Sequence, residues 1–291
     1  MLSFYSLINK LNEFWADYGC VVLLPYTTEV GAGTLTPDTI FNVIGNQFCK
    51  RSYVQKVIRP ADGRYGDNPN RLYQHHQYQV ILKPSPSNIQ DLYLKSLESI
   101  GIDINKHDIR FIEDDWKNPS IGASGVGWEV CCDGMEISQF TYMQQMGGIE
   151  LDIITVELAY GLERIALYLQ KKNSIYDIIY HNDNGQDILY GDIFKANEFD
   201  FSKMALESLD SNIIKKQIDL LDQSIEKLLD DKLPIAALDY CLKFSHHFNL
   251  LDAQGVFSAQ ERGMKLLYIR EAVKKCCQLY IELDIRDKCV V

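Results

Sequence analysis

Segments with β-strand character follow one another through the first half of the chain, and only one clear helix interrupts them. YVQKVIR (53–59) and HHQYQVILK (75–83) flank a polar, turn-rich loop, and residues 121–148 indicate a second strand pair with a turn at Asp133-Gly134. Consecutive strands without long crossovers pair antiparallel. The sequence therefore predicts an α+β fold, with an antiparallel sheet flanked by helices, and not a βαβ nucleotide-binding fold.

The segments around this sheet alternate between helical and strand patterns. Apolar residues recur at helical spacing in the first 15 residues, and short apolar runs bounded by turn residues favour strands elsewhere. The expected elements are an N-terminal helix at 4–18, a short buried strand at 20–26, a loop at 29–39 leading into an apolar stretch, a helix at 84–102, a strand at 107–116 and a helix at about 155–171.

The chain changes character after about residue 172. Three segments with apolar residues at steps of three and four follow, separated by Pro234 and Gly255. We expect a strand-rich domain at 1–172, joined by a polar stretch to a helical C-terminal domain at 173–291.

Composition and cysteine usage indicate where the protein is located and which partners it can bind. No apolar run approaches the ~18 residues of a membrane helix, and the N-terminus has no signal-peptide pattern. The eight cysteines form no C-x-x-C knuckle, so we expect reduced core residues and a soluble, cytoplasmic protein. A net charge of −11 argues against a chain that holds a polyanion by charge alone.

One basic stretch stands out against this acidic background. Residues 50–83 hold seven basic side chains against Asp62 and Asp67, and four of the seven are arginines. Guanidinium groups match phosphate oxygens, so the stretch favours a small phosphate-bearing ligand, with an ordinary basic surface as the alternative. The basic residues are Lys50, Arg51, Lys56, Arg59, Arg64, Arg71 and Lys83.

The usual nucleotide motifs are missing, so another phosphate site is needed. The chain has no G-x-x-x-x-G-K-[ST] and no G-x-G-x-x-G that opens a helix. In ELAYGLERIALYL, Arg164 follows Gly161 by three residues and would share its helical face. An arginine in a helix–sheet seam is costly unless it meets an anion, although an exposed Glu-Arg pair is the simpler interpretation.

Several segments together resemble one known family. GLERIALYL and KVIRPADGRYGDNPNRLYQHHQYQV resemble the third and second signature motifs of class II aminoacyl-tRNA synthetases. In chain order, TTEVGAGTLTPDT, DGRYGDNPNR, GWEV, EISQFTYMQQMGG and SHHFNLLDA are similar to the alpha subunits of bacterial heterotetrameric glycyl-tRNA synthetases. Some of these segments also resemble the catalytic domain of alanyl-tRNA synthetases.

The resemblance implies a fold, a reaction and partners. It implies a six-stranded antiparallel class II sheet, an α homodimer, and a larger β subunit that supplies most of the binding to tRNA(Gly). The implied reaction joins glycine to ATP, giving glycyl-adenylate and pyrophosphate, and then moves glycine to the tRNA. Magnesium would neutralise the triphosphate.

The resemblance also implies roles in ATP binding. Arg59 would hold the α-phosphate and the glycine carboxylate, and Arg164 would hold the γ-phosphate. Arg64 and Arg71 would assist from the hairpin loop. The matching strand carries the metal and phosphate ligands in the family, which suggests Glu136 and Gln139 for magnesium. The other expected ATP contacts are His76 (with His75 as the alternative), Gln79 and Gly161.

Glycine recognition requires an anion for the ammonium group and a wall that excludes larger side chains. Glu157 lies seven residues before Arg164, two turns on the same side of the expected helix. The alanyl family has an acidic residue there, so we expect Glu157 to bind the ammonium, with Glu129 second. Trp128 is the expected wall, or otherwise a core tryptophan, and Gln77 is a further glycine contact.

Two rival interpretations stay open at this point. An alanyl-type catalytic fragment would share several elements, but the DGRYGDNPNR block departs from the alanyl pattern. A non-catalytic scaffold would be expected to have lost the ATP arginines, whereas Arg59 and Arg164 are both present.

Overall fold

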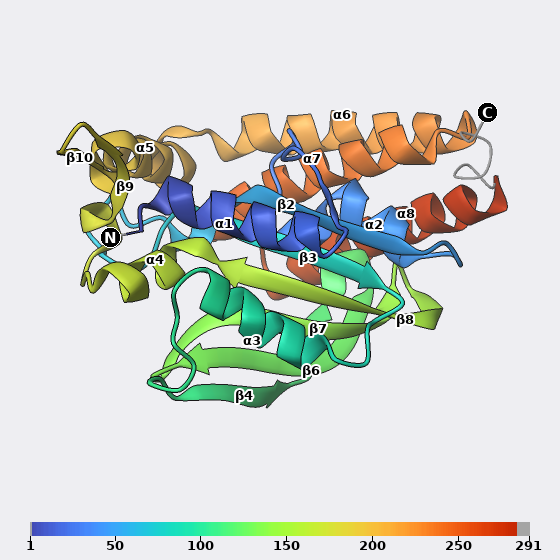
Figure 1. Ribbon diagram of the computed structural model, residues 1–291. Helices are drawn as coiled ribbons and strands as arrows, with labels where there is room; N and C mark the ends of the chain where they lie inside the picture. The colour runs from blue at the N-terminus through green and yellow to red at the C-terminus, as the bar shows by residue number, and fades with distance from the viewer. Residues whose placement is uncertain (1, 284–291) are drawn as a thin grey trace.

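The computed structural model describes residues 2–283, and a single mixed sheet lies at its centre (Figure 1). Six strands pair antiparallel in the order β2-β3-β8-β7-β6-β4, which confirms the predicted sheet; β1 joins one edge parallel to β2, and the short β5 pairs with β6. The strands are β1 Val21–Val22, β2 Cys49–Ile58, β3 Gln74–Lys83, β4 Ile109–Asp114, β5 Lys117–Asn118, β6 Ala123–Cys132, β7 Met135–Met146 and β8 Ile149–Gly161.

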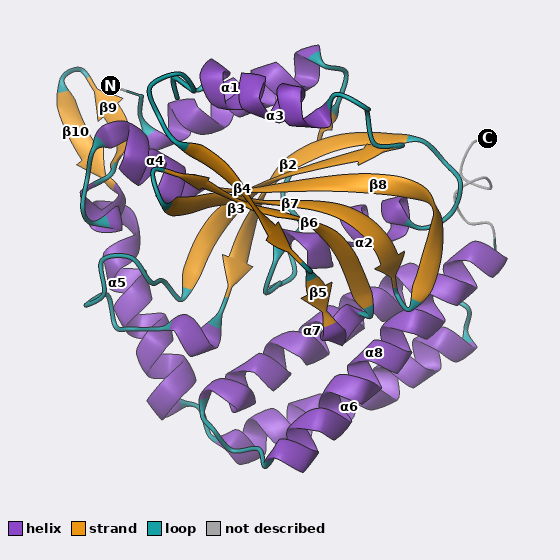
Figure 2. Cartoon of the chain, turned by 90° about the horizontal axis from the view of Figure 1, so that it is seen from below, coloured by secondary structure: helices purple, strands orange, loops and turns teal. Residues whose placement is uncertain are grey.

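Helices cover both faces of this sheet (Figure 2). Along β3, Tyr78, Val80 and Leu82 join the core under one set of helices, whereas Ile81 joins the core under the other set. This alternation follows from the two-residue period of a strand. The first set is α1 Phe4–Asp17, α3 Ile89–Ser99 and α4 Leu162–Gln170; the second is α2 Pro37–Val43, α6 Ser211–Asp230, α7 Pro234–Ala253 and α8 Ala259–Glu282.

The hairpin predicted at about 53–83 is confirmed. β2 and β3 pair from Cys49 opposite Lys83 to Ile58 opposite Gln74. Their connection includes a short 3₁₀ turn at Pro60–Asp62 and carries the arginines of the loop. The second strand pair, β6 and β7, also turns at the predicted Asp133-Gly134.

The helix expected at about 155–171 is wrong over its first half. β8 continues to Gly161, and α4 begins only at Leu162. Val156 and Leu158 point into one core while Glu157 faces the other side. Pairing with β3 and β7 on both sides overrides the helical spacing of these apolar residues.

Three smaller features also differ from the sequence-based expectation. The stretch after the Gly-rich loop is α2, started by Thr36, whose hydroxyl accepts from the amide of Thr39. The strand expected to be buried, β1, leaves Val21 60% exposed because it is a sheet edge. The polar stretch expected to join two domains holds a hairpin of β9 Ile179–Asp183 and β10 Gln186–Leu189.

The C-terminal helices are confirmed, and they pack directly on the sheet. Ile81 and Met143 from the sheet share one apolar cluster with Phe244 and Val273 from α7 and α8. They follow α5 Tyr190–Lys203 and a short π-helix at Met204–Ser208. The boundary at 172 stays a prediction. Within the described residues, every helix is too short or too polar to cross a bilayer.

Candidate active site

A cavity of about 670 Å³ is lined both by the sheet and by α7 and α8. We call its two sides the sheet wall and the helical wall. Gly31, Ala32, Thr34 and Leu35 and residues of the β2–β3 loop also line it. The sheet wall comprises His75, Gln77, Glu136, Ser138, Gln139, Glu157, Ala159, Gly161 and Arg164; the helical wall comprises Ser245, Phe248, Asn249, Asp252, Arg262 and Leu266.

Glu157 is the buried anion of the sheet wall. It lies on β8, is 1% exposed, and accepts a hydrogen bond from the Thr34 hydroxyl at 2.8 Å. With its amide nitrogen toward this carboxylate, Gln79 donates a second bond at 3.3 Å and accepts from the Thr34 backbone amide at 3.1 Å. Burial raises the pKa of Glu157 to about 7, because both partners are neutral. A cation entering the cavity would be its natural partner.

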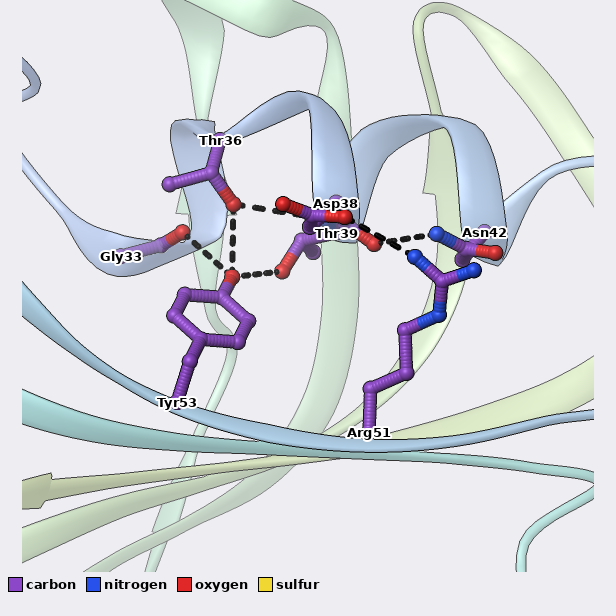
Figure 3. Close-up of polar contacts among 7 residues, drawn as sticks. All are labelled: Gly33, Thr36, Asp38, Thr39, Asn42, Arg51 and Tyr53. Atoms are coloured by element: carbon purple, nitrogen blue, oxygen red, sulfur yellow. Dashed lines mark hydrogen bonds and ion pairs between the residues drawn. The ribbon is translucent and has the colours of Figure 1, made fainter. Parts of the chain in front are cut away.

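The loop at residues 31–35 forms one end of the cavity and is fixed at several points. The Gly33 amide donates to Gln77 at 2.9 Å, and the Gly33 carbonyl accepts from the Tyr53 hydroxyl at 3.1 Å (Figure 3). A Cβ added at Gly33 would overlap the Gln79 side chain, so only glycine allows the loop to lie this close to β3.

Arg59 stands at the end of β2, where the hairpin loop begins. Its Nε donates to the Gly31 carbonyl at 3.0 Å, which fixes the guanidinium beside the loop. Desolvation, opposed by Asp62 and reinforced by Arg164, lowers the pKa of Arg59, although an arginine stays protonated in proteins. Arg71 also lines the cavity and pairs with Asp62 at 3.2 Å.

Arg164 reaches the cavity from the first turn of α4. Its Nη1 donates to both the carboxylate and the backbone carbonyl of Glu136, at 2.6 and 3.1 Å. Gly161 is the N-cap of this helix and joins β8 to α4. The shared helical face expected for Gly161 and Arg164 is wrong, because Gly161 belongs to the strand.

Oxygen donors gather on the sheet wall beside Arg164. Gln139 donates to Asp114 at 2.9 Å, and Glu129 lies opposite Gln139 in the strand register. Burial and the charges of Glu136 and Asp114 raise the pKa of Glu129. Carboxylates that repel one another in this way suit a hard divalent cation, which takes oxygen ligands.

His75 lies on the cavity wall, and His76 is turned away from it. His76 Nδ1 contacts the Glu163 carboxylate at 2.8 Å, and its ring packs against Phe4 on the opposite face of the sheet. Burial, opposed by Glu163 and reinforced by Arg59, lowers the pKa of His75 to about 4, so this imidazole is neutral. The expectation of an ATP contact at His76 does not fit this orientation; of the two histidines, His75, which was the alternative, faces the cavity.

Four further expected residues are absent from the cavity lining: Gln79, Glu129, Trp128 and Arg64. Trp128 packs edge-on against Phe111 and Phe140, with ring centroids 5.7 and 5.2 Å away, so it is a core residue and not the wall of a glycine pocket. Arg64 donates to the carbonyls of Ala61 and Gly63 in its own loop. The side chains of Trp128 and Arg64 are used in local structure.

The helical wall was missed by the sequence analysis. Ser245, Asn249 and Asp252 recur at four- and three-residue steps on α7, which places them on one face of the helix. Asp252 pairs with Arg262 of α8 at 2.9 Å. Ser245, Asn249 and Asp252 lie in SHHFNLLDA, one of the segments that resembles the family, and that resemblance was the available signal. Trp116 and Thr34, also in the lining, were missed as well.

Comparisons with known proteins identify relatives over nearly the whole chain. The profile of the family described as glycyl-tRNA synthetase alpha subunit matches residues 4–284. A glycine–tRNA ligase alpha subunit from Rickettsia bellii is 48% identical over 284 residues, covering 97% of this chain and 98% of the relative. The corresponding protein of Coprothermobacter proteolyticus is 49% identical over 281 residues, covering 97% and 95%.

Solved structures give a more distant similarity. A pyrrolysyl-tRNA synthetase from Desulfitobacterium hafniense superposes with a TM-score of 0.43 and 12% sequence identity, covering 64% of this chain and 76% of that one.

Proposed function

Because the chain belongs to the glycyl-tRNA synthetase alpha subunit family, we propose that it activates glycine with ATP and, with a β subunit, transfers it to tRNA(Gly). The observation that carries the proposal is the buried carboxylate of Glu157 in a cavity that also contains Arg59 and Arg164. Glycine carries an ammonium and a carboxylate, and ATP carries phosphates. The cavity offers one group of the required charge for each.

The first half-reaction requires alignment more than acid–base chemistry. A glycine carboxylate oxygen attacks the α-phosphorus of ATP, a new P–O bond forms, and pyrophosphate leaves with the electron pair of the broken bond. Glu157 binds the ammonium and thereby orients the amino acid. Arg59 holds the carboxylate and the α-phosphate together, and Arg164 binds the γ-phosphate. Arg71 supports the phosphates from the hairpin loop.

Magnesium fits the oxygen-rich end of the sheet wall. Glu136 and Gln139 line the cavity there, and Glu129 and Asp114 lie beside them. When bound, the ion neutralises phosphate charge. We assign Glu136 and Gln139 as the residues that face it. Glu136 also holds Arg164, so it links the metal end of the site to the γ-phosphate end.

Selectivity for glycine arises where the loop meets β3. Gln77 and Gln79 both contact the Gly33–Thr34 segment, and Glu157 lies directly beneath Thr34. A larger amino acid, once its ammonium contacts Glu157, would direct its side chain toward these groups. Exclusion by contact of this kind requires no editing step. It replaces the role first expected for Trp128.

The assembly proposed is an α homodimer that binds a β subunit. Val21 on the edge strand β1, Leu24 after it and Phe48 before β2 are exposed apolar side chains, with 60%, 87% and 74% exposure, which suits a second α chain. An acidic chain (net charge −11) with one basic stretch, at residues 50–83, suits ATP better than tRNA, so most tRNA contacts are assigned to the β subunit. A cytoplasmic location agrees with the buried thiols of Cys20, Cys131, Cys132, Cys241, Cys276 and Cys277 in the described residues.

The test is ATP–pyrophosphate exchange on the purified chain, with and without the β subunit, and with glycine, alanine or serine. We expect exchange with glycine alone, and its loss in Arg164→Ala. Arg110→Ala, which removes an exposed arginine paired with Asp108 elsewhere, is the matched control and keeps full exchange. Absence of exchange with every amino acid, even with the β subunit present, would contradict the proposal and favour a scaffold.

A further inference from the structure

Tyr53 is a buried tyrosine of β2 whose hydroxyl lies under the loop at the end of the cavity. It is 1% exposed, and its hydroxyl contacts the Thr36 and Thr39 hydroxyls at 2.6 Å each and the Gly33 carbonyl at 3.1 Å (Figure 3). A carbonyl cannot donate, so Tyr53 donates to Gly33 and accepts from the two threonines. Its one hydrogen and both lone pairs are used.

The Gly33 peptide links this hydroxyl to the carboxylate of Glu157. The Tyr53 hydroxyl donates to the Gly33 carbonyl, and the side-chain oxygen of Gln77 accepts from the Gly33 amide at 2.9 Å. The next residue, Thr34, donates its hydroxyl to Glu157 at 2.8 Å. Because Thr34 directly follows Gly33, a shift of the Gly33 carbonyl would also move the Thr34 hydroxyl that is bound to Glu157.

The neighbouring helix α2 is attached to the same two strands. Arg51 of β2 pairs with Asp38 at 2.9 Å, and the buried Lys83 of β3 donates to the carbonyls at the end of α2, including that of Val43 at 2.8 Å (Figure 3 for Arg51 and Asp38). Two cations of the basic stretch thus hold α2 and do not line the cavity. The loop and α2 are anchored as one unit. Arg59 also contacts this unit, through the Gly31 carbonyl at 3.0 Å, whereas Arg71 and Arg164 pair with Asp62 and Glu136 outside it.

From these contacts we propose that Tyr53 is the positioning residue for the glycine ammonium pocket. It acts through the Gly33–Thr34 peptide, setting where Thr34 meets Glu157 and how much room remains for a side chain. The proposal rests on the proposed function, because it assumes that the amino acid binds at Glu157. The amino acid depends on this unit more than ATP does, because two of the arginines assigned to the phosphates, Arg71 and Arg164, are held by Asp62 and Glu136 outside it.

The test is Tyr53→Phe, which removes the hydroxyl and keeps the ring. We expect the KM for glycine to rise about five- to tenfold, the size of one buried hydrogen bond to a positioned group. The KM for ATP should stay within about twofold, and exchange with alanine should rise relative to glycine. Tyr160→Phe is the matched control, since it removes an equally buried hydroxyl that contacts Ser96 on the other face of the sheet.

A second variant keeps the inference testable if Tyr53→Phe does not fold. Thr39→Val keeps the shape of the side chain and removes one donor to Tyr53; it should raise the KM for glycine in the same direction by a smaller factor. Equal rises in both KM values, or a rise no larger than in Tyr160→Phe, would overturn the inference. If the unsubstituted chain with its β subunit shows no exchange with glycine, the proposed function itself fails, which is a different result.

Discussion

The two walls of the cavity differ in how their charges are compensated. On the helical wall, Asp252 and Arg262 neutralise each other across α7 and α8 at 2.9 Å. On the sheet wall, Glu136 and Arg164 pair at 2.6 Å, but the buried Glu157 accepts hydrogen bonds from the neutral donors Thr34 and Gln79. A buried charge without a counter-charge costs free energy unless a ligand supplies one. We therefore assign the binding of charged ligand groups to the sheet wall and structural support to the helical wall.

Glu157→Gln should have the largest effect. The substitution keeps the shape and the bond from Thr34 but removes the charge, so kcat/KM for glycine should fall by about 100- to 1000-fold, as expected for losing one partner of a desolvated charge pair. Thermal protection by ATP and magnesium should not change, because the phosphates bind elsewhere. Glu226→Gln, on the exposed side of α6, is the control.

Equal losses of glycine and ATP binding in Glu157→Gln would break the comparison, because the residue would then support the whole cavity and not one ligand group.

The pH dependence of glycine binding tests the same carboxylate without a substitution. The free protein holds Glu157 with a pKa of about 7, raised by burial. Only the ionised form binds an ammonium, so the KM for glycine should rise about tenfold for each pH unit below 7. The KM for ATP should not follow this curve. A flat KM for glycine between pH 6 and 8 would contradict the assignment.

The same shift predicts how stability depends on pH. The pKa of Glu157 is higher in the folded chain than in the unfolded chain, so the folded state binds more protons between about 4.5 and 7. Its contribution to stability is therefore present below about 4.5 and is lost as the pH rises to about 7. Denaturant titrations of the ligand-free chain at several pH values should show this slope, and Glu157→Gln should remove it.

The helical wall is expected to tolerate loss of its ion pair. Asp252→Asn with Arg262→Gln should lower exchange with glycine by no more than about threefold, since the pair is 31% and 52% exposed and such pairs contribute about 1 kcal/mol or less. Each single variant serves as the control for the double one. A loss approaching that of Glu157→Gln would place the helical wall in the reaction and overturn the division between the walls.

The sequence predicts those site residues whose positions are set by local structure. Arg59 and Arg164 were predicted because each belongs to a short motif that forms its own hairpin or helix start. Glu157 was also predicted, but for a wrong reason, since it lies on β8 and not on a helix. The helical wall was not predicted, because Asp252 and Arg262 reach the cavity only through packing between segments far apart in sequence.

The errors on the sheet itself have one physical cause. A strand places neighbouring residues on opposite faces, so His75 faces the cavity and His76 faces the other core. When helices cover both faces, apolar alternation does not say which face is the site. The same ambiguity led to Trp128 being assigned to the wall, whereas its neighbour Glu129 lies on the side of Gln139.

Trp128→Phe should therefore have the smallest effect on activity. Its ring is packed among Phe111, Phe140 and Tyr142, all on the face opposite the cavity. Loss of part of the indole should lower the free energy of unfolding by about 1–2 kcal/mol, by leaving a small void. Glycine-dependent exchange should stay within about twofold, and alanine should remain excluded. If Trp128→Phe admits alanine without Tyr53→Phe doing so, the pocket wall belongs to β6 and not to the loop, and the sheet wall must be redrawn around that strand.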